Sequence, residues 1–166
     1  GIFMIDSKND IELRHFFKTL NTMVMIGVSA SPLRASFFVA RYFVLRGIRI
    51  IPINPNYQGK KLWGEEVLGN IRDIKTGTNV DMVDIFRPSN EVPAIVEDIL
   101  EHLVPLGCRT IWMQIGIKNN KAALKARKEG ISVIMDKCPK IEYQRLFGEL
   151  RVAGFNTGII SSKIDI

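Results

Sequence analysis

The sequence predicts a doubly wound α/β domain with a mostly parallel sheet of about five strands and helices on both faces. Strand-length apolar runs alternate with segments of helical periodicity along most of the chain, which is the order of a sheet built from βαβ units. The apolar runs are continuous, as in parallel strands that are buried on both faces. The 166 residues are 46% hydrophobic, which is enough for one buried core.

The first third of the chain contains two expected helices and the first strand. Asn9 or Asp10 can cap a short helix over about 9–20. The run MVMIGV at 23–28 predicts a buried strand. A helix over about 35–46 follows, and the glycine directly after it provides a stop.

The middle of the chain contains two strands separated by a long polar segment. The run IRIIPI at 48–53 predicts the second strand, and VDMVDIF at 80–86 predicts the third. The segment 57–79 is polar and contains several glycines, so we expect little more than a short helical turn near 69–74. The clearest helix covers 89–104, because its apolar residues recur at intervals of three and four.

The last third continues the same alternation. TIWMQIG at 110–116 predicts a fourth strand and ISVIMD at 131–136 a fifth. Helices are expected over 119–129 and about 140–147. A short mixed tail over about 148–166 has no clear pattern.

Elements in this order join through right-handed crossovers into a Rossmann-like sheet. There is no internal repeat and no sign of a second domain, so we expect one domain over 1–166. Ligands of such sheets bind beyond the carboxyl ends of the strands. The candidate segments are therefore 27–36, 54–61, 86–91 and 114–119.

Composition narrows the classes of partner. The formal charge of +6 favours an anionic ligand, but the basic residues are scattered, so neither a nucleic-acid arm nor nucleic acid as a partner is expected. No apolar run approaches the roughly 18–20 residues of a membrane span. Cys108 and Cys138 lie far apart without a CxxC motif, which argues against a metal site and a disulfide framework. We expect a cytoplasmic protein that binds a small anionic molecule.

The loop GVSASPLRAS at 27–36 is a candidate phosphate site. A helix that starts near residue 35 leaves its first backbone N–H groups unpaired and directs a partial positive charge at the loop. Ser29, Ser31 and Ser36 add hydroxyl groups, and Arg34 adds a charge. The alternative is that Ser31 or Ser36 only caps the helix.

A nicotinamide dinucleotide fits this loop poorly. The G-x-G-x-x-G fingerprint needs glycines for the approach of the pyrophosphate, and serines occupy most of this turn. The fingerprint also needs an acidic residue at the end of the second strand. The chain has Asn54 and Pro55 there instead.

The third and fourth strand ends carry weaker signals. Phe86 and Arg87 can face a ligand, although an aromatic residue is usually packed in the core and an arginine usually solvated. Gln114 and Gly116 interrupt an apolar run. A glutamine at the end of a buried strand needs a hydrogen-bond partner, either a ligand or the backbone.

Five blocks of sequence together resemble a known family. They are GVSASPLRAS, IPINPNYQGKKLWGEEV, VDMVDIFRPSNEVPAIVEDIL, IWMQIGIKNNKAALKARKEGISVIMDKCPKIEYQRL and NTGIISSK. In this order, over about residues 12–163, they resemble the small stand-alone CoA-binding domain proteins. These are similar to the CoA-binding domain of the succinyl-CoA synthetase α subunit and of the NDP-forming acyl-CoA synthetases.

The resemblance implies a coenzyme A (CoA) or acyl-CoA ligand and a role for each strand end. The loop after the first strand would carry the CoA phosphates, and the second strand end would flank the adenosine. The third would line the pantetheine–pyrophosphate path, and the fourth would lie near the thiol. The implied binding residues are Gly27, Ser29, Ser31, Pro32, Arg34, Ser36, Asn54, Pro55, Asn56, Phe86, Arg87, Pro88, Gln114 and Gly116.

The resemblance has one departure at the second strand end. In the synthetases a lysine closely follows the proline of this turn and meets the ribose 3′-phosphate. Asn56 and Tyr57 stand at this place in the present chain, so Lys60 or Lys61 would have to substitute.

The sequence offers no convincing catalytic group, so the leading hypothesis is a CoA-binding module without catalysis of its own. The synthetases carry a phosphorylated histidine in a separate domain, whereas His15 and His102 read most simply as surface or packing residues. Asp81 and Asp84 have an odd spacing, which places them on opposite faces of a strand. Cys138 could act only if nearby lysines and the helix start lowered its pKa.

Two alternatives stay open. The chain can be an accessory subunit or enzyme that acts on acyl-CoA together with a partner chain. It can also be, less favourably, an NAD(P)-dependent oxidoreductase. Association with a second copy of the chain or with a partner protein is compatible with either reading.

Overall fold

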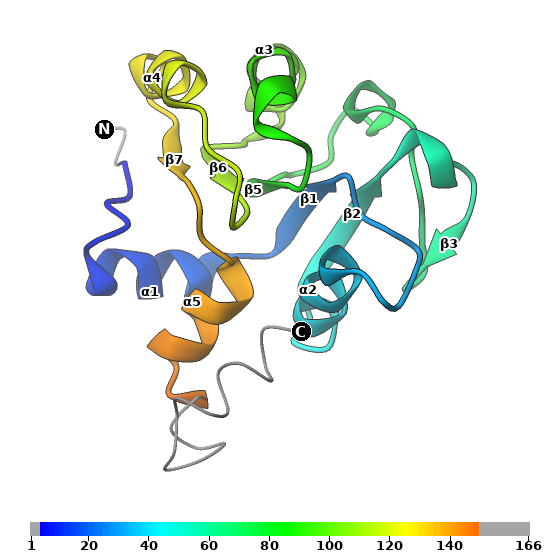
Figure 1. The fold of residues 1–166 in the computed structure, drawn as a ribbon, viewed down its shortest axis with the longest axis horizontal. Helices are drawn as coiled ribbons and strands as arrows, with labels where there is room; N and C mark the ends of the chain where they lie inside the picture. Colours follow the sequence, from blue (N-terminus) through cyan, green and yellow to red (C-terminus); the bar gives the residue numbers. More distant parts are fainter. Residues whose placement is uncertain (1–3, 150–166) are drawn as a thin grey trace.

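A five-stranded parallel sheet forms the centre of the molecule in the computed structural model, which describes residues 4–149 (Figure 1). The strand order is β2-β1-β5-β6-β7, and every pair is parallel. The strands are β1 (Thr22–Ile26), β2 (Arg49–Ile53), β5 (Met82–Ile85), β6 (Thr110–Met113) and β7 (Ser132–Ile134). The predicted doubly wound, Rossmann-like α/β fold is confirmed.

Helices cover both faces of this sheet (Figure 1). On one face lie α1 (Asp10–Thr19), α2 (Ala35–Val44) and α5 (Pro139–Leu146). On the other face lie α3 (Val92–His102) and α4 (Asn120–Lys128). Each face has its own apolar core, because alternate side chains of the buried strands point in opposite directions.

The helix starts follow from local capping. The Asn9 side chain accepts hydrogen bonds from the N–H groups of Ile11 and Glu12 at the start of α1, as predicted. Asn119 caps α4 in the same way, through the N–H of Ala122. None of the described helices is long and apolar enough to cross a membrane.

The central strands end earlier than predicted, and this decides which residues reach the sheet edge. β1 stops at Ile26 because Gly27 has a φ of +89°, which turns the chain out of the sheet. β5 and β6 likewise stop at Ile85 and Met113. The residues just after these strands therefore belong to loops at the carboxyl edge.

The helix predicted over 89–104 is divided into three pieces. It opens with a 3₁₀ turn, η3 (Ser89–Glu91), continues as α3, and is followed by a second turn, η4 (Val104–Leu106). The third piece ends at Gly107, whose φ of +101° stops any helical continuation.

The segment 57–79 contains the expected short helical turn and also a hairpin that was not predicted. The expected turn is present as η2 (Ile71–Asp73), but an antiparallel hairpin, β3 (Lys61–Leu62) and β4 (Glu65–Glu66), precedes it. A further turn, η1 (Pro55–Tyr57), begins directly after β2. The hairpin was missed because each strand has two residues, too few to show alternation.

The predicted last helix is found as α5, one residue earlier than expected. The tail predicted over about 148–166 lies almost entirely outside the described residues.

Candidate functional site

The carboxyl ends of β1 and β5 mark the point where the strand order reverses. β2 lies on one side of β1, and β5, β6 and β7 follow on the other. In open α/β sheets the crevice at this point is the usual ligand site, because the connections on its two sides run over opposite faces. At this crevice a Cβ on Gly27 would lie 2.9 Å from Cδ of Arg87, so the two loops are in close contact.

The loop after β1 is held in shape by its own serines. The N–H of Ser29 donates to Oγ of Ser36 over 2.9 Å, and the N–H of Ser31 donates to Oγ of Ser29 over 3.0 Å. The reading in which Ser31 or Ser36 caps the helix is wrong, since the N-cap residue of α2 is Arg34, without a side-chain cap. Two of the serine hydroxyls therefore organise the loop.

The start of α2 is open to an anion. Within residues 4–149 the backbone N–H groups of Ala35 and Ser36 have no hydrogen-bond acceptor. The exposed guanidinium of Arg34 has no ion-pair or hydrogen-bond partner in the same part of the chain. Unpaired N–H groups at a helix start, the helix dipole and a free cation together favour a phosphate.

A cavity of about 350 Å³ lies on the α3 side of this loop, and we name it the α3-side cavity. Five residues of the predicted site line it: Gly27, Asn54, Pro55, Asn56 and Arg87. It is also lined by Ile26, Ile53, Gly69, Asn70, Ile71, Glu91, Ile95 and Asp98.

Two of these side chains shape the α3-side cavity through internal contacts. Asn54 donates from Nδ2 to the carbonyl of Val28 over 2.8 Å, and its Oδ1 accepts from the N–H of Asn56 over 3.0 Å. Its amide thus ties the loop after β2 to the loop after β1. Arg87 forms an ion pair with Glu91 at 2.9 Å.

A second cavity, of about 400 Å³, lies between α2, α5 and the ends of β5 and β6, and we name it the α2–α5 cavity. Phe86 and Gln114 of the predicted site line it. The other lining residues are Ala35, Phe38, Val39, Ile115, Ile117, Cys138, Lys140 and Ile141. Because Ala35 is also the first residue of α2, the open helix start adjoins this cavity.

Eight predicted residues line neither of these two cavities: Ser29, Ser31, Pro32, Arg34, Ser36, Lys60, Pro88 and Gly116. The Lys60 ammonium lies 5.8 Å from the centre of the Tyr57 ring. Pro88 precedes η3, and the N–H of Gly116 donates to Asp136 over 2.7 Å. Ser31, Pro32 and Arg34 lie on the loop between the cavities, exposed or half-buried.

The sequence did not single out the segment Gly69–Ile71 of the α3-side cavity. Leu68 pairs with Ile53 at the end of β2, which brings this segment beside the sheet edge. Asn70 caps η2 by accepting from the N–H of Arg72. The available sequence signal was an asparagine after a glycine, which is typical of a helix cap. This signal does not indicate that the segment lies beside β2, because that position depends on the hairpin, which the sequence pattern did not show.

The hypothesis that Cys138 is a reactive thiolate with a lowered pKa was wrong. Burial raises the pKa of this thiol, and the Gln114 amide beside it lowers the pKa by less. The thiol is therefore held in its protonated form, which is a poor nucleophile.

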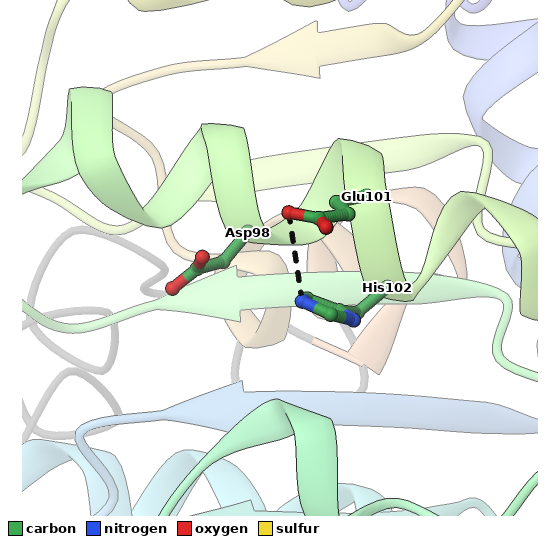
Figure 2. Close-up of side chains that lie close together, drawn as sticks. All are labelled: Asp98, Glu101 and His102. Carbon is green, nitrogen blue, oxygen red and sulfur yellow. Dashed lines mark ion pairs between the residues drawn. The ribbon is translucent and has the colours of Figure 1, made fainter.

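Asp98, Glu101 and His102 lie close together on α3 (Figure 2). One potential ligand atom from each lies within 4.8 Å of the others, and His102 Nε2 is 3.7 Å from the Glu101 carboxylate. Glu101 is largely exposed and all three residues belong to one surface of one helix. Such an acidic cluster is common on protein surfaces without a metal, and we assign no metal site to it.

The comparisons with known proteins agree with the fold. The chain is 28% identical over 132 residues to an uncharacterized protein, YneT, of Bacillus subtilis, a match that covers 80% of this chain and 92% of that protein. A structure from Thermus thermophilus, described as cell-free ID.343, is 36% identical with a TM-score of 0.71, and covers 84% of this chain and 99% of that one.

A hypothetical protein from Pyrococcus horikoshii supports the fold. It has a TM-score of 0.73 at 24% identity, over 89% of this chain and 99% of that one.

Residues 21–144 match the CoA binding domain family, and this range includes β1 to β7 and nearly all of α5. The chain belongs to the CoA binding domain family.

Proposed function

We propose that the chain binds coenzyme A, or an acyl-CoA, with its phosphates at the start of α2 and without catalysis of its own. One observation carries the proposal. The N–H groups of Ala35 and Ser36 and the guanidinium of Arg34 are unpaired within the described residues, and they lie beside the crevice where the strand order reverses.

The two cavities suit the two ends of CoA. The adenosine would occupy the α3-side cavity, where Asn56 and Arg87 supply polar groups and Ile71 supplies an apolar surface. The pantetheine arm would run from the start of α2 into the α2–α5 cavity, past Ala35 and Phe86. This arrangement gives the loop 27–36 the central position that the family resemblance implies.

Few residues are candidates for binding the ribose 3′-phosphate of CoA. Lys60 is exposed and lies over the Tyr57 ring, and the Tyr57 hydroxyl is 3.5 Å from Oγ of Ser29. Lys60 therefore stands near the loop after β1 without lining a cavity. We assign the 3′-phosphate to Lys60 as part of this proposal, with Lys61 as the neighbouring alternative.

The buried reactive groups do not support independent catalysis. Neither oxygen of the Asp84 carboxyl has a hydrogen-bond partner among residues 4–149, and its side chain is fully buried. The thiol of Cys138 has a raised pKa. An enzymatic role would thus need groups from a partner chain, which is the second hypothesis of the sequence analysis.

We expect Arg34→Ala to weaken CoA binding about tenfold. A hydrogen bond to a charged group contributes roughly 1.5–3 kcal/mol, and the open site favours the lower half of this range. Isothermal titration calorimetry on the purified chain measures the affinity. Arg41→Ala is the matched control, because Arg41 is an exposed arginine of the same helix, away from its start.

Ser36→Ala should have a smaller effect on affinity. The variant keeps its own N–H and loses the hydroxyl that accepts from Ser29, so the loop should lose about 1 kcal/mol of stability. The double variant combines Arg34→Ala with Ser36→Ala. If Arg34→Ala and this double variant both bind CoA as tightly as Arg41→Ala does, the loop 27–36 does not hold the phosphates.

A further inference from the structure

The α2–α5 cavity has a mostly apolar lining. Its volume is about 400 Å³, and its lining includes Phe38, Val39, Phe86 and Ile141. Ile115, also in the lining, is 56% exposed. The cavity can therefore bury hydrocarbon that extends beyond the cysteamine end of CoA.

Gln114 of the cavity lining, and Asp84 nearby in the sheet, have buried polar atoms that lack partners among residues 4–149. Gln114 is 8% exposed, and among residues 4–149 its Oε1 accepts no hydrogen bond. Asp84 lies on the neighbouring strand, two residues before Phe86 and therefore on the same face of the sheet. A buried acceptor without a donor is costly, so a ligand that brings an N–H group is favoured.

The cysteamine part of CoA brings such a group. Its amide N–H is separated from the sulfur by two carbon atoms, so an arm that reaches Gln114 places the sulfur and any attached acyl group among the apolar residues. A 180° rotation of the Gln114 amide exchanges its oxygen and its NH₂ group, so this side chain can present its acceptor to the arm.

We propose that the α2–α5 cavity binds the acyl group of an acyl-CoA and that this group is an uncharged aliphatic chain. The proposal rests on the proposed function, because the phosphates must first place the pantetheine arm at Ala35. A dicarboxylic acyl group fits less well, since its terminal carboxylate would lose its hydration among apolar side chains such as Phe86 and Ile141.

The experiment compares CoA, butyryl-CoA and succinyl-CoA by titration calorimetry on the purified chain. Each buried CH₂ group contributes roughly a fourfold gain in affinity, and we expect partial burial, so butyryl-CoA should bind about tenfold more tightly than CoA. Succinyl-CoA should bind no more tightly than CoA.

Two variants connect this preference to the cavity. Ile141→Phe narrows the cavity and should reduce the ratio of butyryl-CoA to CoA affinity to less than about threefold. Leu124→Phe is the control, because Leu124 is an exposed residue of α4 on the other face of the sheet, and it should keep the ratio. Should Ile141→Phe not fold, Ile115→Lys, at an exposed residue of the lining, tests the same point.

The outcomes separate the two proposals. Equal affinities for CoA and butyryl-CoA would overturn the acyl cavity and leave CoA binding intact. Tighter binding of succinyl-CoA than of butyryl-CoA would also overturn it, and would indicate a role for Lys140 of the cavity lining. Absence of binding by all three would contradict CoA binding itself.

Discussion

Asp84→Asn should raise the free energy of unfolding at alkaline pH by about 2 kcal/mol or more, since an unpaired buried charge is among the costliest features of a protein core. Asp84 is fully buried on β5, and neither of its carboxylate oxygens has a hydrogen-bond partner within residues 4–149. Burial therefore raises the pKa of this carboxyl well above its usual 3.8.

The direction of the pH dependence follows from proton linkage. Because the Asp84 pKa is higher in the folded chain than in the unfolded chain, the folded chain binds more protons, and stability falls as pH rises from 3.8 towards the raised pKa. Urea unfolding of the wild type and of Asp84→Asn at pH 5, 7 and 9 measures this. The free energy of unfolding of Asp84→Asn, relative to that of the wild type, should increase as pH rises.

Asp81→Asn is the control, because Asp81 directly precedes the same strand, β5. The Asp81 carboxylate accepts from the N–H groups of Asn21 and Thr22 at 2.7 and 2.8 Å, so its loss should destabilise the fold. A difference between Asp84→Asn and the wild type that stays constant from pH 5 to 9 would show that Asp84 does not titrate in a buried site.

Gly27→Ala should both destabilise the fold and weaken CoA binding about tenfold or more. Gly27 has a φ of +89°, which costs a residue with a Cβ about 1–2 kcal/mol. The added Cβ would lie 2.9 Å from Cδ of Arg87 and 3.4 Å from the Phe86 carbonyl carbon. It would therefore push apart the two loops that border the crevice.

Gly47→Ala separates these two effects. Gly47 has a φ of +82°, but no atom lies within 4 Å of the position that its Cβ would take, and it follows α2 at the end away from the site. We expect a similar loss of stability with unchanged CoA affinity, measured by thermal unfolding and calorimetry. Equal losses of affinity in both variants would mean that Gly27 acts through stability alone.

The fold could be predicted because its signals are local and repeated. Each central strand is a continuous apolar run, α1 and α4 have asparagine caps, and α3 has clear apolar periodicity. The hairpin at 61–66 has neither signal, and its turn places Trp63 at a φ of +52°, a conformation that the residue type does not suggest.

The candidate site was predictable to the level of strand ends, but not to the level of side-chain contacts. The family resemblance implies that Asn54 flanks the adenosine, and the structure adds that Asn54 lines the α3-side cavity while its amide bonds to Val28 and Asn56. The sequence also grouped Phe86 with Arg87, although their side chains line different cavities on the two faces of the sheet. Such differences depend on where a strand ends, and pattern rules locate strand ends poorly.

Thermal unfolding with CoA, NAD and NADP at equal concentrations tests CoA binding most directly. A ligand present at 100 times its Kd adds about 2.7 kcal/mol to the free energy of unfolding. We expect CoA to raise the melting temperature and both nicotinamide dinucleotides to leave it unchanged, because serines replace most of the glycines that the pyrophosphate of either dinucleotide needs in the loop 27–36. For NAD, the carboxylate that would bind the ribose 2′-hydroxyl is also missing at Asn54. A larger rise with NAD or NADP than with CoA, or no rise with CoA, would contradict the proposed function.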